Sequence, residues 1–535
     1  MNNNHQETKL EFSHWLIFST LFLALMFSLA TIAVAQTETS PTDQIETPQE
    51  VEQPIAAGPI CRYGVASFNT ADNPYIDQLD AGWMVDFKVN LSRSVPSGVE
   101  YVPIIRIGQQ RDSQTGVRLD NYYLKEPASF TALGTIVDAN PGKLWLVGNE
   151  VDRYYWQDDV MPQVYAKAYH DIYAFIKQRD PSAQIAISGL VEVTPGRLQY
   201  LDIVWDTYLD LYDTPMPVDV WNMHVYILPE IKDNGQGSNA AVALGTDPAL
   251  AKLESIKTDG SGYYDCALDN VYCYAEHDDM TIFAKQVTDM RQWMKDKGLQ
   301  NKPLILSEFS LLYSYDGGPD GACFLMDENS KCFNPTRVNQ FMTNAFNYLE
   351  NAADPNLGYP ADNNRLVQQW LWFAINDSAP ETPNKLVEYV NGNPTSFTSM
   401  GTNFKNYVAG KASTVNLYPT SATYTAVFIN SAPISVNVTN NGNSLNNGSY
   451  TVTFYSDGGL QNPIGSVVIN TPMNGCARHT QTATITWNGL VPGVNPYWAK
   501  VDSGNAVGES NETNNVIAGI VLMNPEQIFL PTIKR

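Results

Sequence analysis

Short runs of apolar residues alternate with longer amphipathic stretches between residues 60 and 390, and this alternation limits the folds that the chain can adopt. Eight runs are predicted to be strands, at residues 63–68, 83–89, 102–108, 144–150, 183–190, 218–226, 303–310 and 367–375. Near-continuous apolar runs are typical of parallel strands that are covered on both faces. The pattern therefore predicts an α/β fold built on parallel strands.

The stretches between these runs carry apolar residues at helical spacing. Three such faces are Tyr165, Ala168, Ile172 and Ile176, then Phe283, Val287, Met290 and Met294, and then Val338, Phe341, Ala345 and Leu349. Eight strands with intervening helices fit a (β/α)8 TIM barrel with insertions. A doubly wound open sheet is the alternative, but it expects a Gly-rich phosphate loop after the first strand, and residues 69–72 contain no Gly.

The pattern changes after residue 412. Ile434, Val436 and Val438 alternate with polar residues, and residues 450–455 and 483–487 repeat this short-strand pattern between turns rich in Gly, Asn and Pro. Such alternation predicts an antiparallel β-sandwich. The expected fold is thus a (β/α)8 TIM barrel at residues 60–412 followed by an all-β immunoglobulin-like sandwich at 413–527. Residues 528–535 are a short apolar tail with a basic end, which is either a last strand or an export tag.

The stretch from Val501 to Asn515, VDSGNAVGESNETNN, resembles the signature of the CARDB (cell-adhesion-related) domain. The resemblance implies an immunoglobulin-like domain whose role is spacing or adhesion at the cell surface. A purely structural appendage is the alternative.

The N-terminal segment predicts export. Residues 15–35 are apolar or small, with Ser and Thr as the only polar members, and they end in Ala33-Val34-Ala35, an A-x-A cleavage pattern. Twenty-one residues are also enough to span a bilayer, so residues 1–35 are a cleaved signal peptide or an N-terminal anchor. Residues 36–59 are rich in Thr, Glu, Gln and Pro and read as a flexible linker. Either reading places the rest of the chain outside the cell or on its surface.

Export makes disulfides plausible for the six cysteines. Cys266 with Cys273 and Cys323 with Cys332 are expected to close two loops, while Cys61 and Cys476 either pair across the domains or stay free. The Cys and His spacings match no metal site, so neither a metal nor a cofactor is expected. The 32 Lys and Arg against 56 Asp and Glu give a net charge of −24, which excludes nucleic acid as a partner.

Polar residues at the ends of the predicted strands are the candidates for function, because the active site of a TIM barrel lies at the carboxyl ends of its strands. They are Arg106, Asn149, Glu150, His224, Tyr226, Glu308, Trp370 and Trp372. Glu150 and Glu308 each end a strongly apolar run. Two facing carboxylates are what glycosidic cleavage needs, one to protonate the leaving oxygen and one to attack the anomeric carbon or activate water. The alternative is that both are structural charges paired with Arg106 or Arg153.

Asn149-Glu150 on the fourth strand, His224-x-Tyr226 on the sixth, Glu308 on the seventh and Trp on the eighth resemble the retaining TIM-barrel glycoside hydrolases of clan A. The resemblance implies that Glu150 is the acid/base, Glu308 the nucleophile, Asn149 a ligand of the sugar 2-hydroxyl and Tyr226 a hydrogen-bond donor to the nucleophile. Many members of the clan carry an Arg on the second strand. Here the nearest candidate is Arg106 on the third.

The remaining candidates are assigned to substrate binding. We expect His224 to orient the carboxylates. Trp370 and Trp372 face the same side of their strand, and the one nearer the rim is expected to be a sugar platform. The sequence as a whole predicts a secreted, monomeric, retaining β-glycosidase that acts on a polysaccharide or oligosaccharide, with possible attachment to the cell surface through the C-terminal domain. The alternative is a non-catalytic carbohydrate-binding or adhesion protein.

Overall fold

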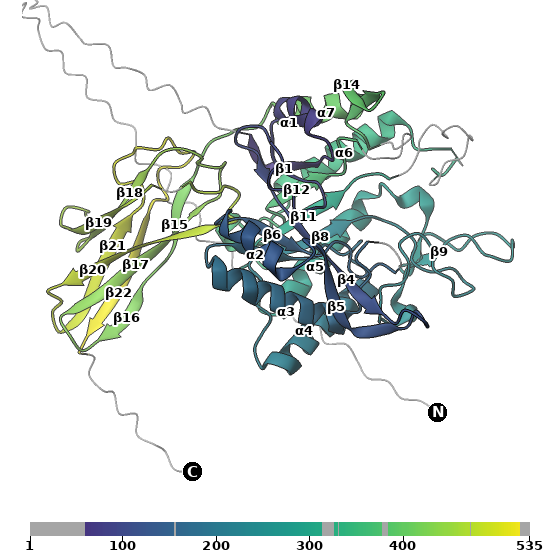
Figure 1. Ribbon diagram of the computed structural model, residues 1–535. Helices are drawn as coiled ribbons and strands as arrows, with labels where there is room; N and C mark the ends of the chain where they lie inside the picture. The colour runs from purple at the N-terminus through teal and green to yellow at the C-terminus, as the bar shows by residue number, and fades with distance from the viewer. Residues whose placement is uncertain are drawn as a thin grey trace, which may run out of the picture. The chain divides into compact units, whose positions relative to one another are not determined.

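The structure is a computed structural model that describes residues 59–154, 157–312, 326–329, 331–376, 384–470 and 472–524 (Figure 1). All of the described residues belong to one compact unit, Pro54–Arg535. The predicted signal or anchor at 1–35, nearly all of the linker at 36–59, the tail at 528–535 and Cys323 lie outside the described residues. Within the described ranges, no helix is both long and apolar enough to cross a membrane.

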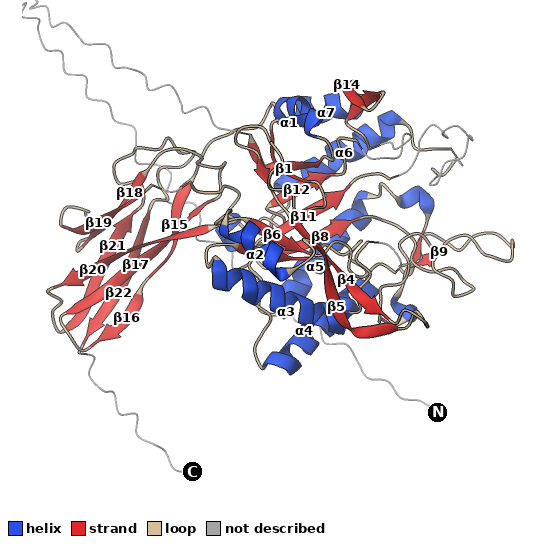
Figure 2. Cartoon of the chain, viewed as in Figure 1, coloured by secondary structure: helices blue, strands red, loops and turns tan. Residues whose placement is uncertain are grey.

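The part of the chain before residue 412 is a mixed α/β structure (Figure 2). Each of the eight predicted strands is present. They are β1 (Ile60–Ala66), β2 (Ala81–Val85), β4 (Ile104–Arg111), β6 (Leu144–Val147), β7 (Gln184–Ile187), β8 (Trp221–Val225), β11 (Leu304–Phe309) and β12 (Gln369–Trp372). A two-residue strand, β3 (Glu100–Tyr101), precedes β4.

These strands pair in parallel, as the apolar runs predict. One sheet has the order β3-β2-β1-β12-β11-β8, and a second contains β4, β6 and β7. A parallel bridge between Ala186 and Val220 joins β7 to the segment before β8. On the other side, Ile104 N donates to Lys88 O, just beyond β2. Neighbouring strands therefore follow one another in chain order, and β12 lies beside β1.

Helices connect the strands and bury the faces predicted for them. They are α1 (Asn73–Gln78), α2 (Phe130–Asp138), α3 (Pro162–Arg179), α4 (Pro195–Tyr212), α5 (Met280–Asp296), α6 (Pro335–Asn351) and α7 (Ser399–Val408). All twelve residues of the three predicted faces are buried. Local signals start the helices: Ser129, Asp279 and Asn334 accept hydrogen bonds from the first turns of α2, α5 and α6, and α3, α4 and α6 begin with Pro.

Two apolar clusters explain why the strands are apolar on both faces. The larger cluster lies between strands and helices and includes Val65, Trp145 and Phe346. The smaller one gathers the alternate strand residues, such as Val85, Ile305 and Leu371. Because successive side chains of a strand point to opposite faces, each of the eight strands except β8 contributes to both clusters.

Several short elements have no counterpart in the prediction. β5 (Arg118–Glu126) pairs antiparallel with β4, and β13 (Val387–Val390) with β14 (Asn393–Phe397). The others are β9 (Leu253–Glu254), β10 (Val271–Tyr272) and the 3-10 turns η1 (Thr70–Asp72), η2 (Pro248–Leu250), η3 (Tyr274–Glu276) and η4 (Pro360–Asp362). β5 and β14 are largely exposed, so they lack the apolar pattern by which the core strands are recognised.

The C-terminal part is all β, as predicted. Its strands are β15 (Leu417–Ala422), β16 (Tyr424–Val427), β17 (Ser431–Asn440), β18 (Tyr450–Tyr455), β19 (Pro463–Ile469), β20 (Thr480–Asn488), β21 (Gly493–Lys500) and β22 (Val516–Met523). They form two sheets, β15-β17-β20 and β16-β22-β21-β18-β19, which are antiparallel except for the β16–β22 pair. Ile434, Val436 and Val438 belong to a separate apolar cluster within this part.

The β-sheet part is attached to the amino-terminal ends of the parallel strands. Cys61 in β1 forms a disulfide with Cys476, which resolves the two alternatives left open for this pair. The predicted Cys266–Cys273 disulfide is confirmed, and Cys332 is also disulfide-bonded. Arg478 lies beside this junction, where its Nη1 is 2.7 Å from a carboxylate oxygen of Glu100.

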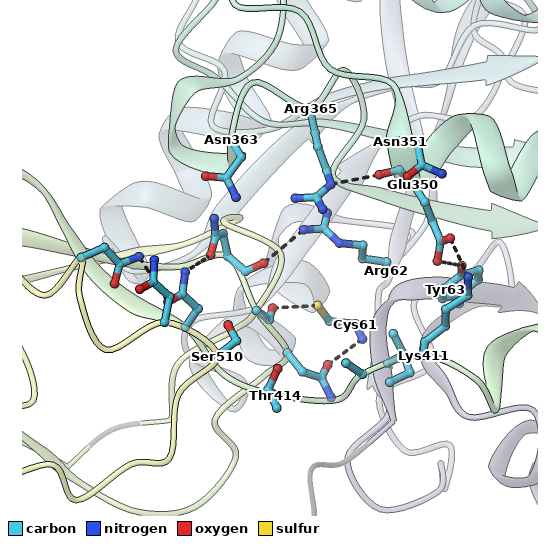
Figure 3. A pocket seen from close by; sticks show the side chains of 18 residues that line it. Cys61, Arg62, Tyr63, Glu350, Asn351, Asn363, Arg365, Lys411, Thr414 and Ser510 are labelled. Atoms are coloured by element: carbon cyan, nitrogen blue, oxygen red, sulfur yellow. Dashed lines mark hydrogen bonds and ion pairs between the residues drawn. The ribbon is translucent and has the colours of Figure 1, made fainter. Parts of the chain in front are cut away.

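A polar cavity of about 440 Å³ lies at the same junction (Figure 3). Its charged side chains pair with one another or with their neighbours: Arg62 binds Asp362, and Lys411 binds Glu350. Arg62 also donates to the backbone carbonyl of Asn441 in the β-sheet part. The cavity thus contributes hydrogen bonds that join the two parts.

The junction predicts that Arg478→Met destabilises the whole of this unit. The Arg478 side chain is only 1% exposed and the Glu100 side chain 21%, so removal of Arg478 leaves Glu100 without its countercharge, which lowers the free energy of unfolding by roughly 1–3 kcal/mol. Thermal and urea unfolding measure the change. Lys285→Met is the matched control, since it breaks an exposed pair with Asp289 that is worth at most about 1 kcal/mol. Equal losses in the two variants would contradict this account of the junction.

Candidate active site

Glu150 and Glu308 meet at the carboxyl ends of the parallel strands. Glu150 follows β6 by three residues, and Glu308 is the penultimate residue of β11. Both side chains are buried, with 2% and 7% of each residue exposed. One oxygen of each carboxylate and one ring nitrogen of His224 lie within 4.8 Å of one another. Three residues predicted from separate strands thus form one cluster.

A sharp turn after β6 points Glu150 into this cluster. Gly148 has φ of +90° and Glu150 has φ of +43°, a backbone region that residues other than Gly rarely adopt. A Cβ at Gly148 would lie 2.6 Å from Val151, so a larger residue does not fit the turn. Asn149 N donates to Asp158 Oδ2 at 2.9 Å, and Glu150 N donates to Gly189 O at 3.0 Å. The surrounding chain therefore holds Glu150 in a backbone conformation that is itself unfavourable.

Residues on β8 and just after it hold the two carboxylates in place. Tyr226 Oη donates to Glu308 Oε1 at 2.7 Å. His224 Nδ1 lies 3.3 Å from Glu150 Oε1 and 3.8 Å from Glu308 Oε2, and its Nε2 lies 3.1 Å from Ser307 Oγ. A Cβ at Gly189 would lie 2.3 Å from the His224 ring, so Gly at this position makes room for the ring. His224 therefore lies within reach of both carboxylates.

Arg153 provides the positive charge on the Glu150 side. Its Nη1 lies 3.3 Å from Glu150 Oε2, and its Nη2 donates to Asn239 O. This ion pair is the one expected with Arg153 if Glu150 is a structural charge. The pair does not involve Glu308, whose described partners are Tyr226 and His224.

The neighbours shift the two carboxylates in opposite directions. Burial raises the pKa of Glu308 to about 7; the charge of Glu150 adds to the rise, while His224 and the Tyr226 hydrogen bond oppose it. Burial also raises the pKa of Glu150, but the hydrogen bond with His224 and the charge of Arg153 outweigh it and leave the pKa below its ordinary value. Burial lowers the pKa of His224, and the two carboxylates more than reverse this. One carboxyl thus keeps a proton up to about neutral pH while the other is ionised.

Arg106 pairs with a buried carboxylate beside the site. Arg106 Nε lies 2.8 Å from Asp158 Oδ1, and its Nη2 donates to Gln157. The Asp158 side chain is fully buried and needs a cation, so Arg106 neutralises Asp158. Among the described contacts, none joins Arg106 to Glu150 or Glu308. Asn149 is buried close to the pair, and its Nδ2 donates to Gln157 Oε1 at 3.2 Å.

The two Trp residues need correction as sugar platforms. Trp370 and Trp372 lie on one face of β12, as predicted, but this face is turned toward the helices, and neither residue is exposed at all. Trp370 packs edge-on against Tyr63, and Trp372 against Phe309. The opposite face carries Leu371 and then Phe373. β12 thus alternates as predicted, but the face that carries Leu371, and not the Trp face, is directed inward.

Behind Glu150 lies a buried ionic cluster that the sequence analysis did not identify. Arg197 pairs with Asp152 at 2.8 Å and with Glu230, and Glu192 lies 3.8 Å away. All four side chains are fully buried. Asp152 therefore anchors the loop after β6. Thr194-Pro195 is a local sequence signal for the start of α4, just before Arg197. No pattern in the sequence indicates which of these charged residues pair with one another.

Two groups of residues in the described part have donor atoms close enough to hold a metal ion. Cys266, Cys273 and Glu276 form one, but both sulfurs are used in a disulfide. Glu150, His224 and Glu308 form the other. Arg153 and the Tyr226 hydroxyl already contact its carboxylates, and the nearby guanidinium charge opposes a cation.

Comparison with protein-family models matches residues 414–519 to the CARDB family, so the CARDB domain predicted for the C-terminal part is confirmed. No curated protein matches the chain. Among solved structures, one similar to the chain is the CARDB domain of a Pyrococcus furiosus protein in complex with di-metal ions. It is 23% identical over 21% of this chain and 89% of that chain, with a TM-score of 0.17.

Two enzymes are similar over most of the chain. A glucosidase from Croceicoccus marinus is 9% identical over 82% of this chain and 94% of that chain, with a TM-score of 0.38. A family 51 α-L-arabinofuranosidase from Bifidobacterium longum is 10% identical over 82% of this chain and 97% of that chain, with a TM-score of 0.37.

The site predicts that Tyr226→Phe moves the Glu308 titration to higher pH. The Tyr226 hydroxyl donates to Glu308 and so favours its charged form. Without this bond, the pKa should rise above about 7. Carbon-detected NMR of protein labelled at the Glu carboxyls measures the shift, and Glu308→Gln identifies the resonance. Tyr418→Phe, which removes a hydroxyl bonded to Ala361 O, is the matched control. A Glu308 titration that stays in place in Tyr226→Phe would show that the bond has no electrostatic effect.

Proposed function

We propose that this protein is a secreted retaining β-glycosidase that hydrolyses O-glycosidic bonds of a polysaccharide or oligosaccharide. The observation that carries the proposal is the approach of a Glu150 oxygen and a Glu308 oxygen to within 4.8 Å, in a buried cluster at the carboxyl ends of parallel strands. Retaining glycosidases hold their two carboxyl groups about 5–5.5 Å apart, while inverting enzymes need about 6.5–9.5 Å to admit a water molecule. The short separation favours direct attack by a carboxylate.

The strand order supports a (β/α)8 barrel as the scaffold. Eight strands succeed one another in parallel and in chain order, and β12 lies beside β1. In such a barrel, the carboxyl ends of the strands carry the catalytic residues. Glu150 and Glu308 occupy those ends.

In the proposed reaction, Glu308 attacks the anomeric carbon while Glu150 protonates the leaving oxygen. A covalent glycosyl ester forms on Glu308. Glu150 then takes a proton from water, the water attacks the same carbon, and Glu308 leaves as a carboxylate. The Tyr226 hydrogen bond stabilises that carboxylate. His224, which lies beside both Glu150 and Glu308, holds the two carboxyl groups in position. Asn149 is assigned to the sugar 2-hydroxyl.

The directions of the two pKa shifts favour a second assignment, in which Glu150 and Glu308 exchange their catalytic roles. In the free protein, the proton is kept by Glu308, whose pKa is about 7, and not by Glu150. With Glu308 as nucleophile, activity must rise as the pH rises through about 7, because attack needs the ionised form. With the roles exchanged, Glu308 is the acid, and activity must fall over the same pH range. The two groups titrate as a coupled pair, so the roles are decided by variants as well as by pH.

The C-terminal domain and the disulfides support the proposed location. A CARDB domain at residues 414–519 suits association with the cell surface. Disulfides such as Cys61–Cys476 and Cys266–Cys273 persist in oxidising compartments. A non-catalytic carbohydrate-binding protein would share these features, but it has no need of two buried carboxylates in contact range.

The roles are tested with Glu150→Gln and Glu308→Gln on a panel of aryl β-glycosides. Loss of the acid/base should reduce kcat/KM by about 10²–10⁴ for poor leaving groups, much less for dinitrophenolate, and added azide should restore turnover as a glycosyl azide of retained configuration. Loss of the nucleophile should abolish turnover with every leaving group. We expect Glu150→Gln to behave in the first way and Glu308→Gln in the second. Glu350→Gln, in the junction cavity, is the matched control.

Three outcomes would overturn parts of this proposal. An exchange of the two behaviours would exchange the roles. Near-normal hydrolysis in both variants would remove the carboxylates from the mechanism and, if no glycoside is hydrolysed by the wild type, leave the binding protein as the better description. Loss of activity in EDTA, restored by a divalent cation, would make the cluster of Glu150, His224 and Glu308 a metal site.

A further inference from the structure

Three phenylalanines pack together at the carboxyl ends of neighbouring strands. Phe68 follows β1 by two residues, Phe87 follows β2 by two, and Phe373 directly follows β12. The rings of Phe68 and Phe87 stack with centroids 5.7 Å apart and an interplanar angle of 19°. Phe373 meets them edge-on at 6.2 and 5.8 Å. We call these three residues the aromatic trio.

The trio lies next to the strand that carries Glu308. β2, β1, β12 and β11 are consecutive in one sheet. Phe373 N donates to the carbonyl of Phe309, the residue after Glu308, at 3.1 Å. The trio and the candidate nucleophile are therefore at the same end of adjacent strands. Glu150 follows β6, which lies in the other sheet.

Two rings of the aromatic trio cover the apolar interior, but the third ring is not needed for this. Phe87 and Phe373 pack against the inner cluster, but 47% of Phe68 remains exposed. Phe87 also has φ of +60°, a conformation that strains a residue with a side chain, costs on the order of 1–3 kcal/mol and is common at functional sites. A cover for the core requires neither an exposed ring nor a strained backbone.

Polar groups line a small cavity beside the exposed ring. The cavity has a volume of about 90 Å³ and is lined by Phe68, Thr70, Asp86, Lys88, Asn90 and Arg93. Arg93 is buried and donates to Ser67 O and Asn69 O, so it fixes the loop that carries Phe68. Lys88 and Asn90 are exposed. A flat apolar ring beside hydrogen-bonding groups suits a neutral sugar, which has an apolar face and a rim of hydroxyls.

We propose that Phe68 and the adjacent Lys88 and Asn90 form a second sugar-binding subsite. It binds the second sugar on the glycosyl side of the cleaved bond, next to the sugar that becomes attached to Glu308. This side is assigned because the trio adjoins the Glu308 strand, while Glu150 serves the leaving group. The substrate class is therefore a chain of at least two sugars ahead of the cleaved bond. This inference rests on the proposed glycosidase function for its direction along the chain.

Phe68→Ala, Phe68→Leu and Phe68→Tyr test the subsite with β-1,3- and β-1,4-linked gluco-oligosaccharides of two to six units and their aryl glycosides. The ratio of kcat/KM for a trioside to kcat/KM for a monoside should fall about tenfold in Phe68→Ala and Phe68→Leu, because both lose the ring face. Phe68→Tyr keeps the ring and should restore the ratio. Phe68→Leu keeps an apolar cover, so it separates loss of stacking from loss of folding. Phe428→Ala, a 73% exposed ring in the C-terminal part, is the matched control.

A binding measurement separates this inference from the proposed function. Calorimetric titration of the same oligosaccharides into Glu308→Gln, with and without Phe68→Leu, should show about tenfold weaker binding in the double variant for chains of three or more sugars. Hydrolysis by the wild type with an unchanged ratio and unchanged binding in the Phe68 variants would overturn the subsite and leave the glycosidase. Weaker binding in the double variant with no hydrolysis by the wild type would keep the subsite and overturn the glycosidase.

Discussion

Two carboxylates buried within 4.8 Å of each other repel, and the rest of the site is arranged around that repulsion. Water cannot screen the charges, so the pair is stable only if it keeps a proton or gains countercharges. Both happen here: the pKa of Glu308 rises to about 7, while Arg153 and His224 lie beside Glu150. The surrounding strands hold the strained backbone turn at Glu150 in place. Gly148 and Gly189 leave the space that this turn and the His224 ring need. A pair with one proton is also the state that acid–nucleophile chemistry requires.

The attachment of the CARDB domain leaves that site free. Cys61 and Glu100 lie at the start of β1 and β3, and Gln184 and Gln369 are the first residues of β7 and β12. Cys476 and Arg478 contact these four residues. The domain is therefore fixed to the amino-terminal ends of the strands, while Glu150 and Glu308 lie at the carboxyl ends. A buried arginine and a disulfide make it part of the folded unit, which is a closer association than a spacer on a flexible linker needs.

Much of the fold could be predicted because burial on both faces leaves a strong pattern. All eight parallel strands and the buried faces of α3, α5 and α6 follow from apolar runs and helical spacing. At the site, Glu150, His224, Tyr226 and Glu308 could be found because each ends an apolar run. Trp370 and Trp372 are predicted on the wrong side of the sheet, because a run that is apolar on both faces does not reveal which face turns inward. Phe68, Phe87 and the Arg197 cluster depend on contacts between distant loops, for which one sequence has no signal.

The central claim is that the two carboxylates are too close for an inverting reaction and act through a glycosyl ester. Proton NMR of the first product released from an accepted β-glycoside measures this most directly, because it records the anomer before mutarotation. The account predicts that the β-anomer appears first and the α-anomer only later, at the rate of mutarotation. An α-anomer formed first would show inversion and contradict the account.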